Sequence, residues 1–559
     1  MDRNTLLAFF LIALVLIFTP KYMETVSPPS VGDFPPDSIS DGDKSLAHKT
    51  VTTSNSDKSL SKTDFPLSPS YNTENEKLTT IDSPLYTAVI SSRGGGTIKS
   101  FHIKDYYMAD SQMVNLVLGL DGLNLLTKVN NIDGQPINLS LPWRQVGWFS
   151  GGGLEEPETL TYSFEFSPGK HIRRVLTFDP GSYIIDIDVR CDDARDVLSG
   201  DLELGWYGGL ATTEKNHKDD QVYFKSYVFQ GGEIENLKVK PGETETALFN
   251  GSADWGAVRT KYFISALIPR DLSSVRRASL TAKYDSLETY DVSFFVDITN
   301  VPIFSLYLGP LEYEKIKGIG VGLDQVMDFG WAFIRPISKG VLFALKSMHE
   351  YIPNYGLVLI VFSFLIKILV YPLTKKSYQS TAAMQVLQPE IAALREKHKN
   401  NSQKLNQATM KLYKERGVNP LGGCLPMLLQ MPLLFALFVV FRTTIELRAE
   451  PFVWWIKDLS APDTIFDLPF TIPIYGSQVA VLPMLMVVSM FIQQKLMSGG
   501  IQQPQQKTMQ YFMTGFFFLI FNSFPSGLNL YYTLFNVLTI AQQKFVPAVE
   551  IVRSIIGCQ

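Results

Sequence analysis

An apolar run from Gly356 to Val370, interrupted only by Ser363 and Lys367, most constrains what this chain can fold into. As a helix, the run is nearly long enough to cross the hydrocarbon core of a lipid bilayer. One face of that helix carries Ser363, Lys367, Tyr371 and Thr374. A lysine inside such a segment costs about 2.5–3.5 kcal/mol on insertion scales, so its ammonium needs a partner or water. Two interpretations stay open: the side chain snorkels to the lipid headgroups, or it lines a hydrated cavity.

Cysteine, histidine and glycine patterns exclude the common cofactor-dependent classes. At 559 residues the chain is too long for one ordinary domain, yet its three cysteines and six histidines are widely scattered. They form neither a disulfide framework nor a zinc site. The glycine-rich stretch 93–100 lacks the spacing of a phosphate-binding loop and is predicted to be a turn between strands. We therefore expect no catalytic residue, no metal ion and no other cofactor.

The N-terminal part changes character twice. Residues 1–19 contain an apolar run without a small-residue cleavage site, which favours an uncleaved transmembrane anchor over a signal peptide. Residues 20–80 are rich in Pro, Ser, Thr, Asp and Lys and are predicted to be a flexible periplasmic linker. Residues 81–320 alternate apolar and polar positions between glycine turns, which predicts an all-β sandwich domain, here called the β-domain.

The β-domain itself shows no recognisable chemistry. Its Glu155, Glu156, His171 and His217 are expected in loops or at strand edges, exposed to solvent. The pattern shows no site directed at a membrane either. We therefore expect the β-domain to be largely dispensable for a function carried out in the membrane.

The C-terminal part alternates apolar runs with polar connectors, which predicts a polytopic α-helical membrane protein with six transmembrane helices. The predicted segments are an amphipathic interfacial helix at 324–352, membrane spans at 355–372, 420–444, 477–495, 509–525 and 527–545, a cytoplasmic helical hairpin at 373–419, a periplasmic loop at 445–476, a cytoplasmic loop at 496–508 and a cytoplasmic tail at 546–559.

Charge asymmetry between the connectors predicts the orientation. The connector Leu373–Asn419 has nine Lys or Arg and three acidic residues, whereas Glu446–Tyr475 has two basic and five acidic residues. The connector Lys495–Lys507 has two basic residues and no acidic one. The positive-inside rule therefore places the helical hairpin and both termini in the cytoplasm, and the β-domain on the outer side of the membrane.

Polar residues recur inside the predicted spans and are the candidate functional residues. They are Ser363 and Lys367 in the first long span, Gln430 in the second, Ser489 and Gln493 in the third, and Tyr532 and Asn536 in the last. Such residues also hold helices together by hydrogen bonds. Stripes on several spans, with one lysine and no carboxylate inside a span, favour a hydrated groove instead. The lack of an acid–base relay and of an internal repeat counts against a solute transporter.

Five motifs resemble the YidC family of bacterial membrane protein insertases in their order and spacing. They are YPLTK at 371–375, VNPLGGCLP at 418–426, QMP at 430–432, WIKDLSA at 455–461 and FPSGL at 524–528. The anchor and the β-domain, including Trp255 and the sequence KYF at 261–263, are also similar to Gram-negative members. The resemblance covers nearly the whole chain except the linker.

The resemblance implies a five-helix insertase core together with a periplasmic β-supersandwich. It also implies a groove open to cytoplasm and lipid, where Lys367 occupies the position of a single positive residue that is usually arginine. Ser363 and Tyr532 match positions that touch the entering substrate segment. The short tail Lys544–Gln559 is hardly basic, unlike the tails that help some relatives to hold ribosomes, so ribosome docking is not expected there.

We therefore expect a membrane protein insertase and chaperone, not an enzyme, which moves hydrophobic segments of new membrane proteins from the cytoplasm into the bilayer. Its expected partners are nascent membrane proteins, the Sec translocon with its accessory subunits, membrane lipids, and a ribosome bound through the helical hairpin. No specific nucleic-acid sequence is expected. The alternatives are a solute transporter with a periplasmic binding domain and a sugar-binding role for the β-domain alone.

Overall fold

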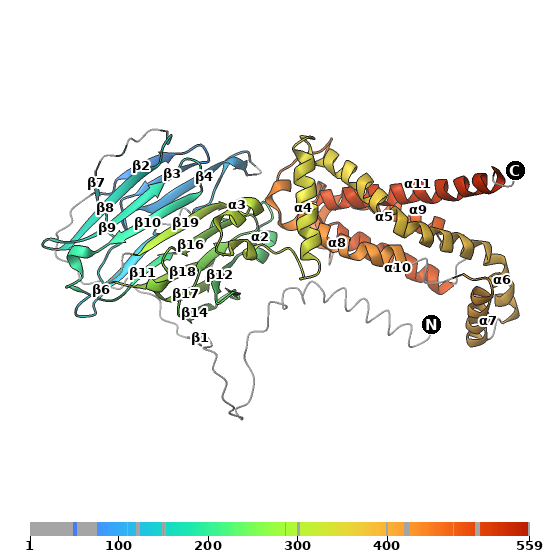
Figure 1. Cartoon of the computed structure of the whole chain (residues 1–559), viewed down its shortest axis with the longest axis horizontal. Helices are drawn as coiled ribbons and strands as arrows, with labels where there is room; N and C mark the ends of the chain where they lie inside the picture. The colour runs from blue at the N-terminus through green and yellow to red at the C-terminus, as the bar shows by residue number, and fades with distance from the viewer. Residues whose placement is uncertain are drawn as a thin grey trace, which may run out of the picture.

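The computed structural model describes residues 49–52, 75–108, 110–118, 123–147, 149, 153–285, 287–298, 302–398, 401–418, 425–472, 475–497 and 504–556. The predicted anchor at 1–19 and most of the predicted linker lie outside these residues. The molecule is elongated, with the β-domain at one end and the long helices at the other (Figure 1).

Three antiparallel sheets build the β-domain. The nine-stranded sheet has the order β13 (Glu233–Leu237), β12 (Lys225–Gln230), β15 (Trp255–Arg259), β16 (Phe263–Pro269), β19 (Ile303–Pro310), β10 (Ile184–Arg190), β9 (Lys170–Phe178), β8 (Glu158–Ser167) and β7 (Arg144–Val146). The six-stranded sheet has the order β1 (Lys49–Thr52), β14 (Thr244–Asn250), β17 (Val275–Tyr284), β18 (Glu288–Asp297), β11 (Leu198–Trp206) and β6 (Leu125–Asn131). The four-stranded sheet has the order β2 (Leu78–Asp82), β3 (Tyr86–Ser91), β4 (Thr97–Tyr107) and β5 (Met113–Asn115).

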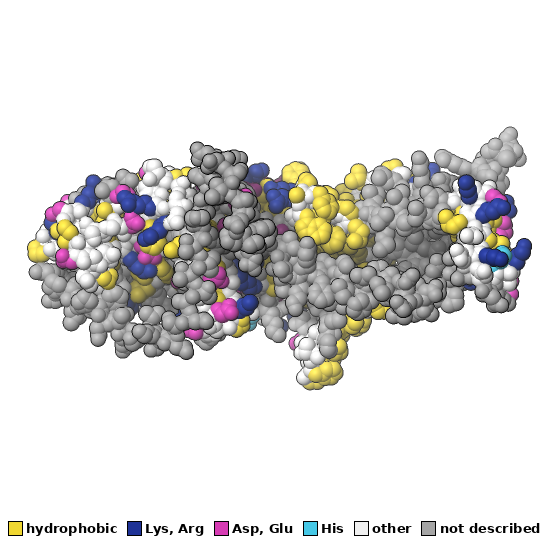
Figure 2. Space-filling model, turned by 90° about the horizontal axis from the view of Figure 1, so that it is seen from below, with side chains coloured by type: hydrophobic (Ala, Val, Ile, Leu, Met, Phe, Trp, Pro, Cys, Tyr) yellow, Lys and Arg dark blue, Asp and Glu magenta, His cyan; other side chains and the backbone are white. Residues whose placement is uncertain are grey.

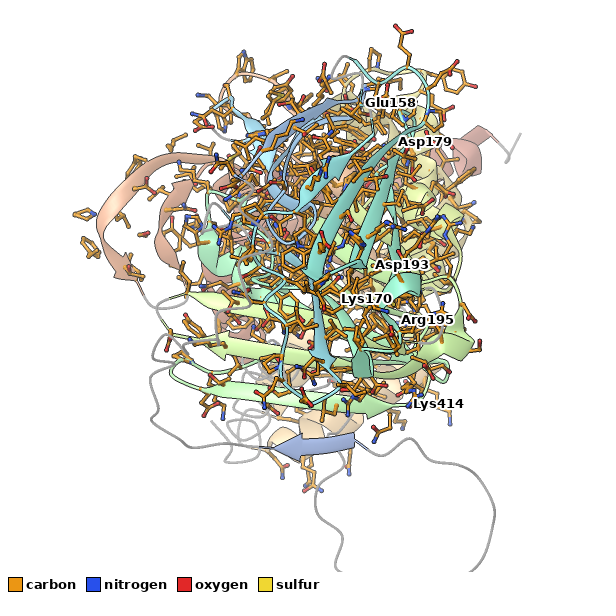
Figure 3. The ribbon with its side chains drawn as sticks, turned by 90° about the vertical axis from the view of Figure 1, so that its left-hand side faces the viewer. Glu158, Lys170, Asp179, Asp193, Arg195 and Lys414 are labelled. Carbon is orange, nitrogen blue, oxygen red and sulfur yellow. The ribbon has the colours of Figure 1, made fainter. Side chains whose placement is uncertain are left out.

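The two smaller sheets pack on one face of the nine-stranded sheet. Phe263 of β16 packs edge-on against Tyr106 of the four-stranded sheet, with ring centroids 5.8 Å apart. Gly256 of β15 lies against Val292 of the six-stranded sheet, where a Cβ atom would come within 3.0 Å. Gly256 pairs directly with Leu267 of β16, and directly paired residues of neighbouring strands point to the same face. Leu267 is an even number of residues from Phe263, so these two side chains also share a face. Both contacts are therefore on the same face of the sheet. The predicted sandwich therefore has one large layer facing two smaller ones, as the end-on view shows (Figure 3).

Helices occupy the other end of the molecule and a few connections of the β-domain. They are α2 (His217–Tyr223), α3 (Tyr313–Ile319), α4 (Arg335–His349), α5 (Tyr355–Val386), α6 (Gln388–Lys397), α7 (Ser402–Glu415), α8 (Leu425–Thr443), α9 (Leu482–Met497), α10 (Pro504–Phe521) and α11 (Ser526–Ile556). A two-stranded hairpin, β20 (Thr464–Ile472) and β21 (Gly476–Ala480), precedes α9. Because α2 lies within the β-domain, the prediction of an all-β domain was incomplete.

Helix α4 lies across the long axis of the molecule, whereas α5, α9 and α11 run along it (Figure 1). Pro336 stands in the first turn of α4, where its missing N–H costs no helical hydrogen bond. Val341, Leu342 and Leu345 are buried, while Phe343 on the other side is 71% exposed. This orientation and this pattern are those expected of an amphipathic helix lying in a membrane surface.

Several element boundaries differ from those expected from the sequence. Helix α5 runs on through Pro372 to Val386, so the first part of the predicted helical hairpin continues the span. The hydroxyl of Thr374 donates to the carbonyl oxygens of Val370 and Tyr371 within the same helix. Residues 49–52, inside the predicted linker, pair with β14. The predicted span at 477–495 begins only at Leu482, because 476–480 form β21, and α11 continues into the predicted tail.

Length and apolarity single out one membrane-crossing helix in the part of the chain that the structure describes. That helix covers Tyr355–Pro372. Gln430–Thr443, Leu482–Leu496 and Tyr511–Phe521 are shorter apolar helices. Helix α8 begins earlier with the apolar residues 425–429, α9 adds only Met497, and α10 begins earlier with the mostly polar residues 504–510.

The turn between β3 and β4 offers a test of packing in the β-domain. Gly95 has φ of +73°, and a Cβ atom there would lie 2.7 Å from the ring of Trp143. We expect Gly95→Ala to lower the free energy of unfolding by about 2–4 kcal/mol, through left-handed strain plus overpacking. Gly134→Ala is the matched control, since Gly134 has φ of +76° with nothing within 4 Å, and should cost about 1 kcal/mol. Urea unfolding followed by tryptophan fluorescence measures both; equal losses would contradict the packing argument.

Candidate functional site

Lys367 of α5 reaches across to α11. Its Nζ atom donates a hydrogen bond of 2.5 Å to Oγ1 of Thr539 and lies 3.7 Å from the ring centroid of Phe535. The Thr539 hydroxyl in turn donates to the carbonyl oxygen of Phe535. Among the described residues, no carboxylate pairs with Lys367. Its charge is therefore stabilised by one hydroxyl and one aromatic face, without an ion pair.

A second polar contact joins α9 to α11. The side-chain amide of Asn536 donates to Oγ of Ser489 at 3.1 Å, and both residues are buried. The hydroxyl of Ser489 in turn donates to the carbonyl oxygen of Met486. One turn further along α9, Gln493 is partly buried, and its side chain has no hydrogen-bond partner in the described part of the chain. The polar residues of α11 thus face α5 on one side and α9 on the other.

One face of α11 carries polar side chains along most of its length. We call Asn529, Tyr532, Asn536, Thr539 and Gln543 the polar stripe of α11. The hydroxyl of Tyr532, Oδ1 of Asn529 and both polar side-chain atoms of Gln543 are buried without a hydrogen-bond partner among the described residues. Buried polar groups usually have partners, and such a concentration of unpartnered ones on one helix face is typical of a surface that meets water or a polar ligand.

Ser363 and Gln430, also predicted from the sequence, are placed differently. Ser363 is fully buried and its hydroxyl donates to the carbonyl oxygen of Leu359 in its own helix. Gln430 lines a mostly apolar cavity of about 530 Å³ between α4, α5, α8 and α11, together with Phe535. Because Phe535 also contacts Lys367, this cavity adjoins the ammonium group. The structure thus links Lys367, Gln430, Ser489, Tyr532 and Asn536 through α11, and leaves Ser363 bonded within α5.

Thr539 is the residue that the sequence analysis missed. It follows Asn536 by three residues and precedes Gln543 by four, so the helical spacing of the stripe already included its position. A threonine in a membrane helix commonly bonds its own backbone, and this one does so as well. Only the approach of Lys367 distinguishes it from Thr533, whose hydroxyl bonds just its own helix.

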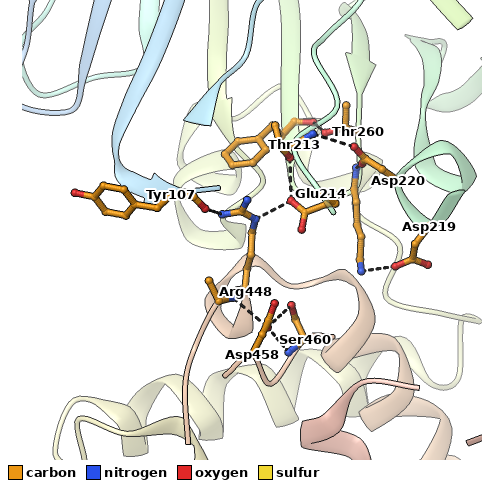
Figure 4. A network of polar contacts seen from close by, with 12 residues as sticks. Tyr107, Thr213, Glu214, Asp219, Asp220, Thr260, Arg448, Asp458 and Ser460 are labelled. Carbon is orange, nitrogen blue, oxygen red and sulfur yellow. Dashed lines mark hydrogen bonds and ion pairs between the residues drawn. The ribbon is translucent and has the colours of Figure 1, made fainter. Parts of the chain in front are cut away.

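A network of ion pairs, here called the junction, joins the β-domain to the helical part (Figure 4). Nε of Arg448 donates to Oε1 of Glu214 at 2.7 Å, and its Nη1 donates to the carbonyl oxygen of Tyr107 at 2.9 Å. At the end of α8, Nη2 of Arg442 donates to Oδ1 of Asp219 at 2.9 Å. The Arg448 side chain is only 4% exposed, so this contact is an interior one.

Helix α2 supplies the acidic side of the junction. Asp219 accepts a second ion pair from Nζ of Lys261 at 2.6 Å, and Asp220 accepts from the backbone N–H of Lys261 at 2.8 Å. Burial alone would raise the pKa of Asp219, but Lys261 and Arg442 together hold it below its ordinary value. Burial raises the pKa of the neighbouring Asp220, and the backbone N–H groups of Lys261 and Thr213 together with the charge of Lys261 offset only part of that rise. The β-domain therefore makes a polar contact with the helical part that the sequence analysis did not predict.

Comparison with known proteins bears on both regions. Residues 347–551 match the family model described as 60Kd inner membrane protein, and residues 78–340 match the model described as YidC periplasmic domain. The chain is 36% identical to the membrane protein insertase YidC of Chlorobium luteolum, covering 98% of this chain and 95% of that one. It is 37% identical to that of Chlorobium limicola, covering 98% and 94%. The chain belongs to the YidC family.

The junction connects the two regions that define this YidC family member. Glu214 and Asp219 fall in the periplasmic domain match, whereas Arg442 and Arg448 fall in the inner membrane protein match. A solved structure titled "Active YidC insertase crystal structure with the first transmembrane domain resolved" is 18% identical, covers 85% of this chain and 93% of that one, and gives a TM-score of 0.37.

Among the described residues, no three His, Cys, Asp or Glu side chains form a group that could hold a metal ion.

The junction predicts how firmly the β-domain is held. Arg448→Ala leaves the mostly buried carboxylate of Glu214 without its positive partner. This change should weaken the docking of the β-domain on the helical part by about 3 kcal/mol. Hydrogen exchange of residues 104–108 and 213–223 in the purified chain should then rise. Arg276→Ala is the matched control, because Arg276 is 58% exposed in its ion pairs on β17 and should leave exchange there unchanged. Unaltered exchange in the Arg448 variant would show that apolar packing alone holds the β-domain.

The same contact has a defined pH dependence. Because the pKa of Asp219 is lowered below 3.8 in the folded chain, its pairing contributes fully above that value and is lost as the pH falls through the lowered pKa. We therefore expect protection at 213–223, after correction for intrinsic rates, to fall as the pH drops below about 4. The raised pKa of Asp220 acts in the opposite direction at higher pH, where ionisation of this buried carboxyl opposes folding. Asp219→Asn should remove the fall below pH 4; a fall that persists in this variant would contradict the assignment to Asp219.

Proposed function

We propose that this chain is a membrane protein insertase, which transfers hydrophobic segments of newly made membrane proteins from the cytoplasm into the lipid of the bacterial inner membrane. It acts as a carrier and folding aid and not as an enzyme. The single observation that carries the proposal is the placement of Lys367. A partly buried ammonium in the one long apolar helix of the described residues faces the polar stripe of α11 with no carboxylate beside it. Family membership and the names of the relatives support the same conclusion.

The proposal includes a topology with six membrane spans, of which α5, α8, α9, α10 and α11 form the five-helix core. The β-domain is periplasmic, α6 and α7 are cytoplasmic, and both termini are cytoplasmic. The picture supports this arrangement, because α6 and α7 lie at the opposite end of the long axis from the β-domain, with α4 crosswise between (Figure 1). The charge asymmetry of the connectors points the same way.

The proposed transfer of a client segment follows from the charge of Lys367 and from the polar stripe of α11. A polar segment of a client that must cross the membrane loses its hydration, which is the main barrier to translocation. The ammonium of Lys367 and the unpartnered polar atoms of Tyr532 and Gln543 replace part of that hydration within the membrane. The apolar segment of the client then moves into lipid, gaining roughly 25 cal/mol per Å² of apolar surface buried. The step needs no nucleotide, because burial of apolar surface drives it.

The other site residues have separate roles in this proposal. Ser489 and Asn536 fix α9 against α11 and so hold the width of the groove. Gln430 and Gln493 contribute polar atoms toward its cytoplasmic and lipid openings. Ser363 is fully buried and bonded within α5, so its proposed role is to keep α5 closely packed beside the groove. Membrane lipids, the Sec translocon with its accessory subunits, and a ribosome at α6 and α7 are the proposed partners.

Lys367 offers the decisive test. Lys367→Arg should keep insertion near the original level, because the charge and its reach are retained. Lys367→Glu should lower insertion most, by about tenfold or more for clients with acidic translocated tails, since attraction becomes repulsion. Lys367→Ala should be intermediate and client-dependent, because the polar stripe of α11 remains. Protease protection of clients that differ only in tail charge, at matched levels of insertase, measures these effects.

Two controls sharpen that experiment. Thr539→Val removes the hydroxyl that accepts from Lys367 and should shift insertion in the same direction as Lys367→Ala, while Thr533→Val should have no effect. Equal insertion by the Arg, Ala and Glu variants for every client would assign Lys367 to anchoring at the headgroups, and would remove the main support for the proposal.

The cytoplasmic helices make a second prediction. Helices α6 and α7 pack as a pair closed by an ion pair of 2.8 Å between Arg416 and Glu390, and Gly417, with φ of +65°, follows the end of α7. Replacing residues 388–416 by a short linker should abolish insertion while leaving the membrane spans folded, because the helices receive clients or a ribosome surface at the groove mouth. The charge-neutral variant Arg416→Gln with Glu390→Gln is the control for pair stability alone. Normal insertion by the deletion variant would make this pair only a connector.

A further inference from the structure

The β20–β21 hairpin is a thin apolar extension beside the helices. Among the described residues, its two strands pair only with each other. Ile465 is 51% exposed, Phe466 is 52% exposed and Phe470 is 61% exposed. Phe466 and Asp467 pair in regular register with Val479 and Gln478, so their side chains point to opposite faces of the hairpin, and both are exposed. Ile465 lies at a register shift between Thr464 and Phe466, where a strand does not alternate regularly. An isolated two-stranded hairpin with three exposed apolar side chains is marginal in water.

The base of this hairpin is held firmly, so its exposure is built into the fold. Oδ2 of Asp463 accepts from the indole of Trp455 at 2.9 Å and from the backbone N–H of Leu482 at 2.8 Å, which ties the start of β20 to the start of α9. The side-chain amide of Asn522, just beyond α10, donates to the carbonyl oxygens of Tyr475 and Gln478 on the β21 side. β21 is therefore anchored against α9 and α10, and β20 is the outer strand.

The pictures show where the hairpin points. Seen along the long axis, it projects sideways from the body of the molecule, at the left in faint orange (Figure 3). In the view from below, the part that stands out sideways at the boundary between the β-domain and the helices carries mostly hydrophobic side chains (Figure 2). This is also the level at which α4 lies crosswise (Figure 1). The hairpin therefore extends in the plane of the membrane surface.

Neighbouring side chains share this apolar and aromatic character. Trp454 is 87% exposed, has φ of +53°, and stacks on Trp455 at 5.7 Å between ring centroids. Bulky side chains rarely adopt that backbone conformation in the absence of a compensating contact. Tyr351, after the end of α4, is 85% exposed. Tryptophan and tyrosine are enriched where a membrane meets water.

The charge and shape of the hairpin select its partner. Residues 464–480 include one charged side chain, Asp467, so a strongly charged partner surface finds nothing to pair with. A protein surface covers one face of a strand, whereas lipid surrounds both. The unpaired outer edge of β20 needs hydrogen bonds, which excludes the dry hydrocarbon core and suits the hydrated boundary between headgroups and acyl chains.

We propose that the β20–β21 hairpin, with Trp454 at its base, inserts sideways into the headgroup–acyl boundary of the periplasmic leaflet next to α9 and α10. It thereby displaces lipid beside the outer ends of these helices. The inference rests on the membrane orientation given under Proposed function. It does not depend on how Lys367 acts on clients.

The test uses the full chain in vesicles of phosphatidylethanolamine and phosphatidylglycerol, with the native cysteines replaced by alanine. A bimane label is attached in turn at Ile465→Cys and Phe466→Cys, two exposed positions of β20. Nitroxide placed near the lipid headgroups should quench both labels at least about twofold, and nitroxide deep in the acyl chains should quench them less. Quenching of only one label, or of neither, would overturn the proposal.

Two reference positions separate the outcomes. Ile132→Cys, on a β-domain residue that is 67% exposed, should not be quenched, and Ile368→Cys, on a span residue that is 70% exposed, should be quenched by the deep nitroxide. Quenching at Ile368 without quenching at the hairpin overturns this inference alone. No quenching at Ile368 removes the proposed membrane placement as well. If both hairpin labels are shielded in native membranes but not in pure-lipid vesicles, a protein partner covers the hairpin and the lipid assignment is wrong.

Discussion

The ammonium of Lys367 is the interaction on which the helical part of this molecule depends. A charge inside an apolar helix is costly, and here one hydroxyl, one aromatic ring and no carboxylate of the described residues offset that cost. Helix α11 must therefore present Thr539 and Phe535 to α5 while its Asn536 turns to α9. The contacts of Lys367 with Thr539 and of Asn536 with Ser489 thus fix how α11 lies against α5 and α9.

A second constraint holds the two halves together. The partly exposed Arg442 at the end of α8 and the buried Arg448 just after it meet acidic residues at and before α2, and these pairs attach the β-domain. Removing one partner of a buried pair is costly even where the pair adds little net stability, so this geometry specifies an orientation more than it adds binding energy. The large domain is consequently part of the same rigid frame as α8, and α4 is clamped to that frame through the pair of Lys346 with Glu312 and Glu446.

Much of this architecture could be predicted because its signals are local. The alternation of apolar and polar residues with a period of two located the β-rich part, and apolar runs located the helical part. Helical spacing placed Lys367 and Asn536 on polar helix faces. The remainder depends on partners that are remote in sequence. In the sequence, Arg442 resembles an ordinary basic residue at the end of a membrane span. Its partner Asp219 lies 223 positions away. Pro372 was read as a boundary, although α5 continues through it to Val386. Strand β20 was assigned to a loop and most of β21 to a membrane span.

The depth of the junction has a consequence for behaviour under osmotic change. Mobile ions screen exposed pairs over about 8–10 Å at ordinary salt, whereas pairs inside protein are screened much less. The contact of Lys170 with Asp196, whose carboxylate side chain is 64% exposed, weakens as salt rises around the cell. The contact of Arg448 with Glu214 weakens much less, because its two side chains are 4% and 16% exposed. The orientation of the β-domain therefore depends less on the salt concentration around it than the exposed pairs on its surface do.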